Sequence, residues 1–111
     1  MKSEYLEYLN RKYGEELKKF GFVFDRIETL DYESGGRFSR AMYHIDKNLV
    51  DYEYGHLYIY VDNEKEKITD IELELRTPTK YYHITESKSM GNLLSILRDI
   101  KLEHDKERQR A

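Results

Sequence analysis

The chain has 111 residues, a net charge of −3 at pH 7 and no cysteine. This length is typical of one domain, so we expect a single domain over residues 1–111. The absence of cysteine excludes disulfides, thiolate zinc sites and thiol catalysis, and the acidic balance offers no general attraction for nucleic acid. Eleven tyrosines and four phenylalanines provide enough apolar surface for a folded core.

Neither a targeting signal nor a membrane segment is expected. The first residues, MKSEYLEYL, carry acidic side chains and lack the apolar centre of a secretory signal. The apolar runs are only a few residues long, far below the roughly 20 that a membrane-spanning helix needs. We therefore expect a cytoplasmic protein without a membrane partner.

An amphipathic helix is predicted from Ser3 to Phe20. Ser3 can cap its first turn, and Gly21 can take the left-handed conformation that ends many helices. Apolar residues then recur every three or four positions, which predicts one apolar stripe. The stripe contains Leu6, Leu9, Tyr13, Leu17 and Phe20.

Two strands are predicted next, over residues 22–30 and 37–45, with a turn at 31–36. The first strand alternates imperfectly, because Phe22 and Phe24 share one face while Ile27 falls on the other, and this indicates a bulge. A polar turn follows the second strand. Residues 49–54 can then form a loop or continue the third strand through a bulge at Gly55, and we expect the bulged strand.

The strongest pattern in the chain is a β-hairpin over residues 56–75. Apolar and polar side chains alternate along both strands, which predicts a sheet with one buried face. The inward residues are Leu57, Ile59, Val61, Thr69, Ile71, Leu73 and Leu75. If Ile59 pairs with Ile71, the opposite face brings together His56 with Glu74, Tyr58 with Glu72, and Tyr60 with Asp70.

The remainder of the chain is predicted to form a connector and a second helix. Pro78 ends the strand because it cannot donate a backbone hydrogen bond, and residues 80–84 are expected to connect. Thr85 or Ser87 can cap a helix that runs to about Leu102, while residues 103–111 are expected to fray. The apolar stripe of this helix contains Met90, Leu93, Leu94, Leu97 and Ile100.

These elements predict an α+β fold in the order α-β-β-β-β-α. The four strands are expected to form an antiparallel meander, since short turns join them. The N-terminal and C-terminal helices are expected to pack on one face of this sheet, where the inward apolar side chains give them a surface to cover.

The sequence contains no recognisable catalytic motif, and we expect a protein that is not an enzyme and needs no cofactor. No pair among the four histidines has the spacing of a helical zinc site; His44 and Asp46 are the best local metal-like pair. Arg37 and Arg40, near a glycine-rich turn, are candidates for a small anion-binding site.

The most informative surface feature is the charge of residues 46–74, which hold nine acidic and three basic residues. The predicted outward face of the hairpin therefore combines tyrosines with carboxylates. Tyrosine is enriched at protein interfaces, and acidic neighbours favour a partner rich in arginine and lysine. The candidate partner-binding residues are Tyr52, Tyr54, Tyr58, Tyr60, Asp70, Glu72 and Glu74.

The leading hypothesis is a non-enzymatic protein-binding module whose acidic, tyrosine-rich face occupies a basic, nucleic-acid-binding groove of a partner protein. Small acidic inhibitor proteins that phages and mobile elements encode act in this way. The comparison is an analogy, because no motif of this sequence is shared with them. Direct nucleic-acid binding is disfavoured, because the acidic face repels phosphate. Two alternatives remain: a small-ligand or nucleotide-binding domain, enzymatic or not, that uses Arg37, Arg40, His44 and tyrosines, and a homodimer formed through sheet edges or helices.

Overall fold

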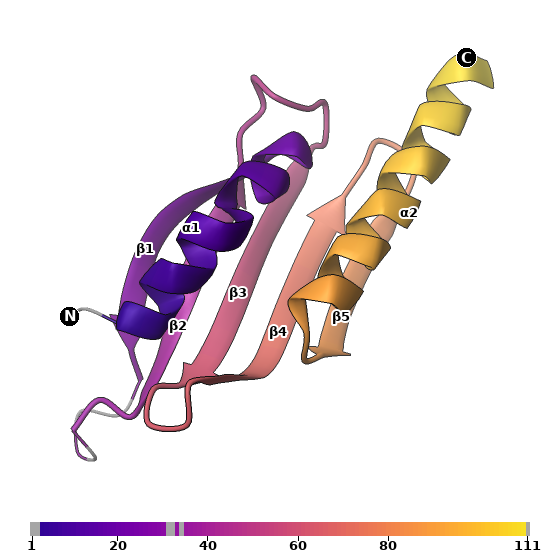
Figure 1. Ribbon diagram of the computed structural model, residues 1–111. Helices are drawn as coiled ribbons and strands as arrows, with labels where there is room; N and C mark the ends of the chain where they lie inside the picture. The colour runs from indigo at the N-terminus through magenta and orange to yellow at the C-terminus, as the bar shows by residue number, and fades with distance from the viewer. Residues whose placement is uncertain (1–2, 31–32, 34, 111) are drawn as a thin grey trace.

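A computed structural model describes residues 3–30, 33 and 35–110. Along the chain, one helix precedes five strands and a second helix follows them (Figure 1). The elements are α1 (Glu4–Lys19), β1 (Phe22–Thr29), β2 (Phe38–Ile45), β3 (Tyr54–Asp62), β4 (Lys67–Arg76), β5 (Tyr81–Ser87) and α2 (Met90–Arg110). The predicted turn at 31–36 includes residues 31, 32 and 34, which lie outside the described residues.

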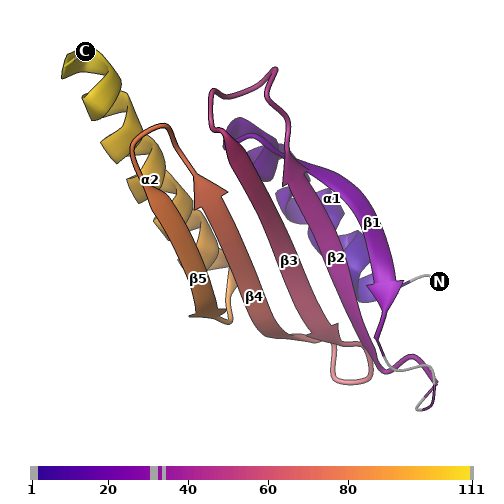
Figure 2. The ribbon, with the colours of Figure 1, turned by 180° about the vertical axis from the view of Figure 1, so that it is seen from behind.

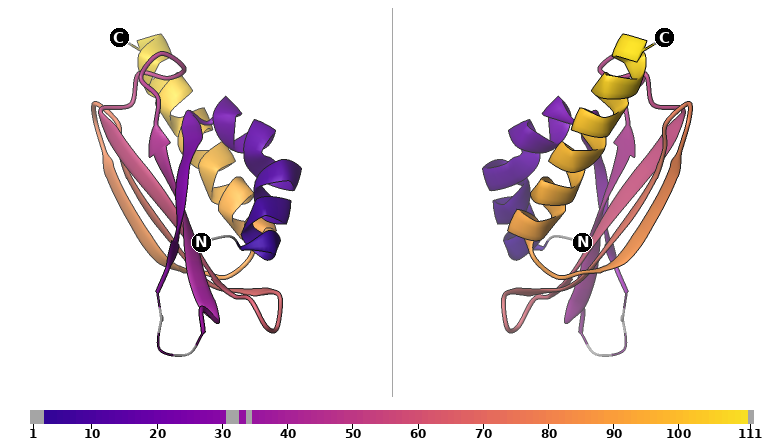
Figure 3. Two further views of the ribbon diagram at one scale, coloured as in Figure 1. Left: turned by 90° about the vertical axis from the view of Figure 1, so that its left-hand side faces the viewer. Right: turned by 90° about the vertical axis from the view of Figure 1, so that its right-hand side faces the viewer.

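The five strands form one antiparallel sheet in the order β1-β2-β3-β4-β5, so every strand pairs with its neighbour in the chain. Both helices lie on the same side of the sheet: α1 crosses the β1 half and α2 the β5 half (Figure 1). Seen from behind and edge-on, no helix covers the other side (Figures 2 and 3). The α+β fold with both terminal helices on one face is thus as predicted.

The hydrophobic core lies between the sheet and the two helices. Both predicted helical stripes are buried or packed against it. Between them, the inward faces of β2, β3 and β4 contribute Ala41, Tyr43, Leu57, Ile59, Val61, Ile71, Leu73 and Leu75. The predicted hairpin register is confirmed, with Ile59 opposite Ile71 and Tyr58 opposite Glu72.

The boundaries of α1 follow from its capping residues. Ser3 accepts a hydrogen bond from the backbone N–H of Leu6 and also donates through its hydroxyl to Asn63, 2.6 Å away in the β3–β4 turn. Gly21 has a φ of 90°, the left-handed conformation expected after the last turn. The start of α1 is therefore tied to the end of the central hairpin.

The sheet has a fifth strand that the sequence prediction missed. Residues 80–84 are not a connector, because β5 pairs along β4 from Tyr81 opposite Arg76. Pro78 does end β4, but it sits in a tight turn in which the backbone N–H of Thr77 donates to the carbonyl of Lys80, and the backbone N–H of Lys80 donates to the hydroxyl oxygen of Thr77. Tyr82 and Ile84 then pack against the core, which gives β5 a buried face.

The segment before β3 is a loop, so the predicted bulged strand over residues 49–54 is wrong. Strand β3 begins at Tyr54, and Gly55 pairs regularly with Leu75. A Cβ atom at Gly55 would lie 2.4 Å from Cγ1 of Ile45 and 2.9 Å from Cδ1 of Leu75. The glycine is therefore required by close packing on the inward face.

Two bulges adjust which side chains face the core. The expected bulge in β1 lies between Phe24 and Arg26, and it brings Ile27 to the inward face opposite Ala41. A second register shift in the hairpin follows the pairing of Tyr60 with Asp70 and places Ile68 opposite Val61. Ile68 therefore packs against the core in the place expected for Thr69.

Helix α2 is longer than predicted and starts later. Its cap is Ser89, whose hydroxyl accepts the backbone N–H of Asn92, rather than Thr85 or Ser87, which belong to β5. The helix continues beyond residue 102 to Arg110. Its last turns are held by contacts to loops, including Glu103 with Lys80 and His104 with Asp51.

Candidate functional site

The side of the sheet opposite the helices is called the open face here. The strand register assigns to it the side chains that alternate with the buried ones. They include Arg26 and Glu28 on β1, Arg40, Met42 and His44 on β2, Tyr54, His56, Tyr58 and Tyr60 on β3, Asp70, Glu72, Glu74 and Arg76 on β4, and Tyr81 and His83 on β5. None of these residues is fully buried.

Four consecutive rings form a ladder along β3, the central strand. The ring centroids of Tyr54 and His56 are 5.7 Å apart, those of His56 and Tyr58 4.4 Å, and those of Tyr58 and Tyr60 6.5 Å. The middle pair is stacked, and the outer pairs meet edge to face. The centre of the open face is therefore a rigid aromatic surface.

A row of polar contacts crosses the ladder from β1 to β5, with one side chain from each strand; its steps from Tyr60 to Glu72 and from Glu72 to His83 are diagonal in the strand register. Arg40 donates to Glu28 at 2.7 Å and to the hydroxyl of Tyr60 at 3.3 Å. Tyr60 donates to Glu72 at 3.5 Å, and Nε2 of His83 lies 3.3 Å from the same carboxylate. The hydrogen bond from Arg40 lowers the pKa of Glu28, so this end of the row is an ion pair at neutral pH.

Positive and negative charges are distributed unevenly over the open face. Arg26 and Arg40 lie on the β1–β2 half, where Arg26 forms ion pairs with Asp25 and Glu28, and Arg40 forms one with Glu28. The carboxylates of Asp70, Glu72 and Glu74 all lie on β4, where the register also places the basic side chain of Arg76 beside them on the open face. The acidic character predicted for the whole face is thus confined to the β4 side.

Six of the seven predicted partner-binding residues lie together on the open face. Tyr52 is the exception and corrects the prediction: it is only 3% exposed and packs beneath α2. Its ring meets that of His104 edge to face at 5.2 Å. Tyr52 precedes β3 in a loop that folds toward the helices, so the alternation of the strand does not apply to it.

The structure does not bring Arg37 and Arg40 into one anion site. Arg37 lies before β2 and donates to the carboxylate of Asp62 at 2.9 and 3.1 Å, while Arg40 pairs with Glu28 on the open face. These hydrogen bonds from Arg37 are the largest cause that lowers the pKa of the Asp62 carboxyl group. Each arginine thus already has a carboxylate of its own, which leaves the ligand-binding alternative without support from this pair.

Sequence reasoning missed Tyr81 and His83, which complete the open face on β5. Tyr81 is 46% exposed, and the guanidinium carbon of Arg76 lies 5.1 Å from the centre of its ring. The alternation of outward Tyr81 and His83 with inward Tyr82 and Ile84 was the available signal. This alternating pattern was obscured by the neighbouring Pro78, and by Thr85 and Ser87, which resemble helix-capping residues.

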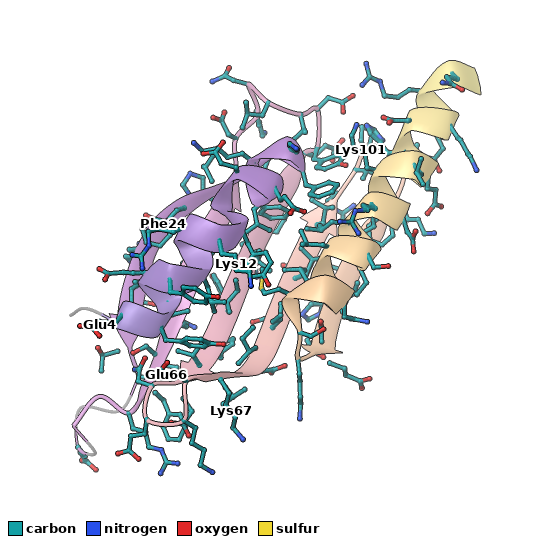
Figure 4. All side chains as sticks on the ribbon, in the orientation of Figure 1. Glu4, Lys12, Phe24, Glu66, Lys67 and Lys101 are labelled. Carbon is teal, nitrogen blue, oxygen red and sulfur yellow. The ribbon has the colours of Figure 1, made fainter. Side chains whose placement is uncertain are left out.

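The largest cleft, about 680 Å³, lies elsewhere, between the start of α1 and the β3–β4 turn. Tyr5, Tyr8 and Arg11 line it together with Glu4 and Glu66, which Figure 4 labels at the lower end of the molecule. In the part of the chain that the structure describes, no three histidine, aspartate or glutamate side chains are grouped to hold a metal ion.

Comparisons with known proteins add no family. No protein-family model matches the sequence, and no match was found among curated proteins or solved structures. Among the described residues, neither helix combines the length and apolarity needed to cross a membrane.

Proposed function

We propose that this protein is a non-enzymatic protein-binding module and that the open face is its binding surface. The observation that supports the proposal is the ladder of Tyr54, His56, Tyr58 and Tyr60 at the centre of a sheet face that no helix covers. Tyrosine rings bury a large area with little loss of side-chain freedom, and their hydroxyl groups remain available for hydrogen bonds.

The size of the open face suits a protein partner. Five strands about 4.8 Å apart and about 27 Å long present roughly 600 Å². Specific protein interfaces bury about 600–1,000 Å² on each partner, so the area of the face is at the lower end of this range. The largest cleft lies outside this face, between α1 and the β3–β4 turn.

The charges on β4 favour a partner that carries arginine or lysine. Among the described residues, Glu74 and Asp70 form no ion pair, and Asp70 accepts a hydrogen bond from the backbone N–H of Ile71. Groups of this sign attract a basic surface and accelerate the encounter at low salt. Within this proposal, a basic groove that normally holds nucleic acid is a suitable target, and the protein would act as its inhibitor.

The same residues argue against direct binding of nucleic acid to the open face. Single-stranded nucleic acids do stack on aromatic side chains of sheets, but they also need basic groups along the backbone path. Here Arg26 and Arg40 are already paired with Glu28, and the β4 carboxylates would repel phosphate.

Site-specific photo-crosslinking in the native host would test the proposal. One variant carries p-benzoylphenylalanine in place of Tyr58 on the open face, and the control carries it in place of Lys101 on α2, on the helix side (Figure 4). We expect a partner protein to be captured from position 58 and not from position 101. Capture from position 101 alone would contradict the proposal.

The purified complex then permits a second test. Because the proposed contacts include exposed charges, affinity should decrease markedly between low and physiological ionic strength. An affinity that does not depend on salt would argue against the carboxylates of β4 as part of the interface.

A further inference from the structure

We infer that Glu74, between Tyr54 and Tyr81, forms a subsite on the open face that receives an arginine side chain of the partner. The inference rests on the proposed function, because it identifies which partner group the face recognises. The subsite lies toward the β4–β5 side of the open face and adds residues of these two strands to the aromatic ladder of β3.

The strand register places two short rows of side chains next to each other at this point. Tyr54, Arg76 and Tyr81 lie opposite one another on β3, β4 and β5, and His56, Glu74 and His83 form the adjacent row. Glu74 therefore lies on the middle strand of the three, with tyrosines diagonal to it on both sides. Tyr54 and Tyr81 are also the most exposed tyrosines of the open face, at 47% and 46%.

Both phenol groups are close enough to Glu74 to sense its charge. Partial desolvation and the nearby Glu74 carboxylate raise the pKa of Tyr54, and the same causes raise the pKa of Tyr81. The hydroxyl of Tyr54 also lies 2.7 Å from Nδ1 of His56, which holds the ring in place. A carboxylate flanked by two oriented aromatic rings is thus present before any partner binds.

Glu74 differs from the other glutamates of the open face in having no basic side chain of a described residue within ion-pair distance. Glu28 pairs with Arg40, and Glu72 contacts His83 and Tyr60. Among the described residues, no arginine, lysine or histidine forms an ion pair with Glu74. A partially desolvated carboxylate without a counter-charge favours the approach of an external cation.

The open face already shows which kind of cation its rings accept. The guanidinium carbon of Arg40 lies 4.9 Å from the ring centre of Tyr58 and 5.9 Å from that of Tyr60. That of Arg76 lies 5.1 Å from the ring centre of Tyr81. A planar guanidinium can stack on a ring while it donates to a carboxylate, which an ammonium group does less well.

The incoming side chain has one ring available at the subsite. Arg76 already lies over Tyr81, whereas Tyr54 meets its neighbour His56 edge to face. An arginine of the partner would therefore stack on Tyr54 and donate to the carboxylate of Glu74, with Tyr81 closing the opposite side.

A titration of the full chain with N-acetyl-L-arginine amide tests the subsite without the partner. NMR signals of the tyrosine rings would be followed in the wild type, in Glu74→Gln and in the matched control Asp70→Asn, which changes another β4 carboxylate. We expect saturable shifts of Tyr54 and Tyr81, and dissociation constants raised about five- to tenfold by Glu74→Gln and unchanged by Asp70→Asn. N-acetyl-L-lysine amide should bind more weakly.

The inference is overturned if the arginine probe shifts neither ring, or if Glu74→Gln and Asp70→Asn bind it as the wild type does. Failure of the proposed function is a separate result. Saturable binding of the probe together with capture from position 101 alone would keep the subsite and contradict the open-face interface. A partner captured at position 58 that binds Glu74→Gln with wild-type affinity would keep the interface and overturn the subsite.

Discussion

His104 on α2 and Asp51 in the loop before β3 are joined by a contact of 2.6 Å between Nε2 and Oδ1. His104 is 6% exposed, and the hydrogen bond from its ring lowers the pKa of Asp51. An ionised carboxylate only accepts hydrogen bonds, so Nε2 carries the proton. The contact holds the β2–β3 loop against the C-terminal half of α2 and encloses the ring of Tyr52.

Replacing this buried ring should destabilise the protein. We expect His104→Ala to lower the free energy of unfolding by about 2–4 kcal/mol, because the contact with Tyr52 and the hydrogen bond to Asp51 are both lost. Urea denaturation measures the change. In the control, Leu102→Ala removes a side chain that is 59% exposed and should change the free energy by less than about 0.5 kcal/mol.

Deletion of residues 103–111 tests whether the end of α2 stabilises the fold, as its contacts indicate, or is a frayed tail, as the sequence alone predicted. Glu103 accepts hydrogen bonds from Lys80 and Tyr82 at 3.0 and 2.9 Å, and Thr79 donates to Glu107. We expect the shortened chain to unfold at a lower urea concentration than the wild type. Equal midpoints would mean that the end of α2 contributes nothing to stability.

Gly55 should tolerate no side chain. The added methyl group of Gly55→Ala would meet Ile45 at 2.4 Å and Leu75 at 2.9 Å, so the core must shift, and we expect a loss of about 1–3 kcal/mol. Gly91 provides the matched control, since a Cβ atom there would have no neighbour within 4 Å. Gly91→Ala lies in a helix and should leave thermal stability unchanged or slightly higher. Equal melting temperatures for the two variants would contradict the packing around Gly55.

The sequence predicted those parts of the fold whose signal is local. Alternation alone was sufficient for the register of β3 and β4, and capping residues for the limits of α1. Strand β5 was missed because its alternating pattern is short and begins directly after the turn that contains Pro78. Its burial depends on β4, to which it pairs, and on the core beneath.

The candidate site was predictable only where it lies on one hairpin. Tyr58 and Glu72 could be paired from sequence, whereas Arg40 reaches the same face from β2 and Tyr81 from β5. Tyr52 was misplaced because its burial depends on His104, which is distant in the chain. Pairing between segments that are distant in the chain therefore determines which charged residues lie on the open face and how far the face extends.

Acid sensitivity should depend on Asp62. Hydrogen bonds from Arg37 keep its pKa below the unfolded value of about 3.9, and its Oδ1 also accepts the backbone N–H groups of Glu64 and Lys65. A lowered pKa in the folded state stabilises the protein above the unfolded pKa, and the stabilisation disappears as the pH falls through the folded pKa.

Asp62→Asn should therefore be less stable than the wild type at pH 7, and the difference should narrow as the pH falls below the unfolded pKa of about 3.9. Thermal unfolding across this range measures the effect. Glu53→Gln is the control, because this exposed carboxylate has no side-chain partner among the described residues. A difference between wild type and Asp62→Asn that stays constant with pH would show that the carboxylate charge is not involved.

Substitutions of two neighbouring residues on β3 should show that the core, and not the open face, provides most of the stability. Leu57 is fully buried, whereas Tyr58 faces outward beside His56 and Arg40. Leu57→Ala should lower the free energy of unfolding by about 2–5 kcal/mol, because it leaves a cavity under the helices. Tyr58→Ser should cost about 1 kcal/mol, since it removes only contacts on the open face, with His56 and Tyr60 along β3 and with Arg40 on β2. Urea denaturation of both variants measures these values, and a larger loss for Tyr58→Ser would mean that the aromatic ladder serves folding rather than binding.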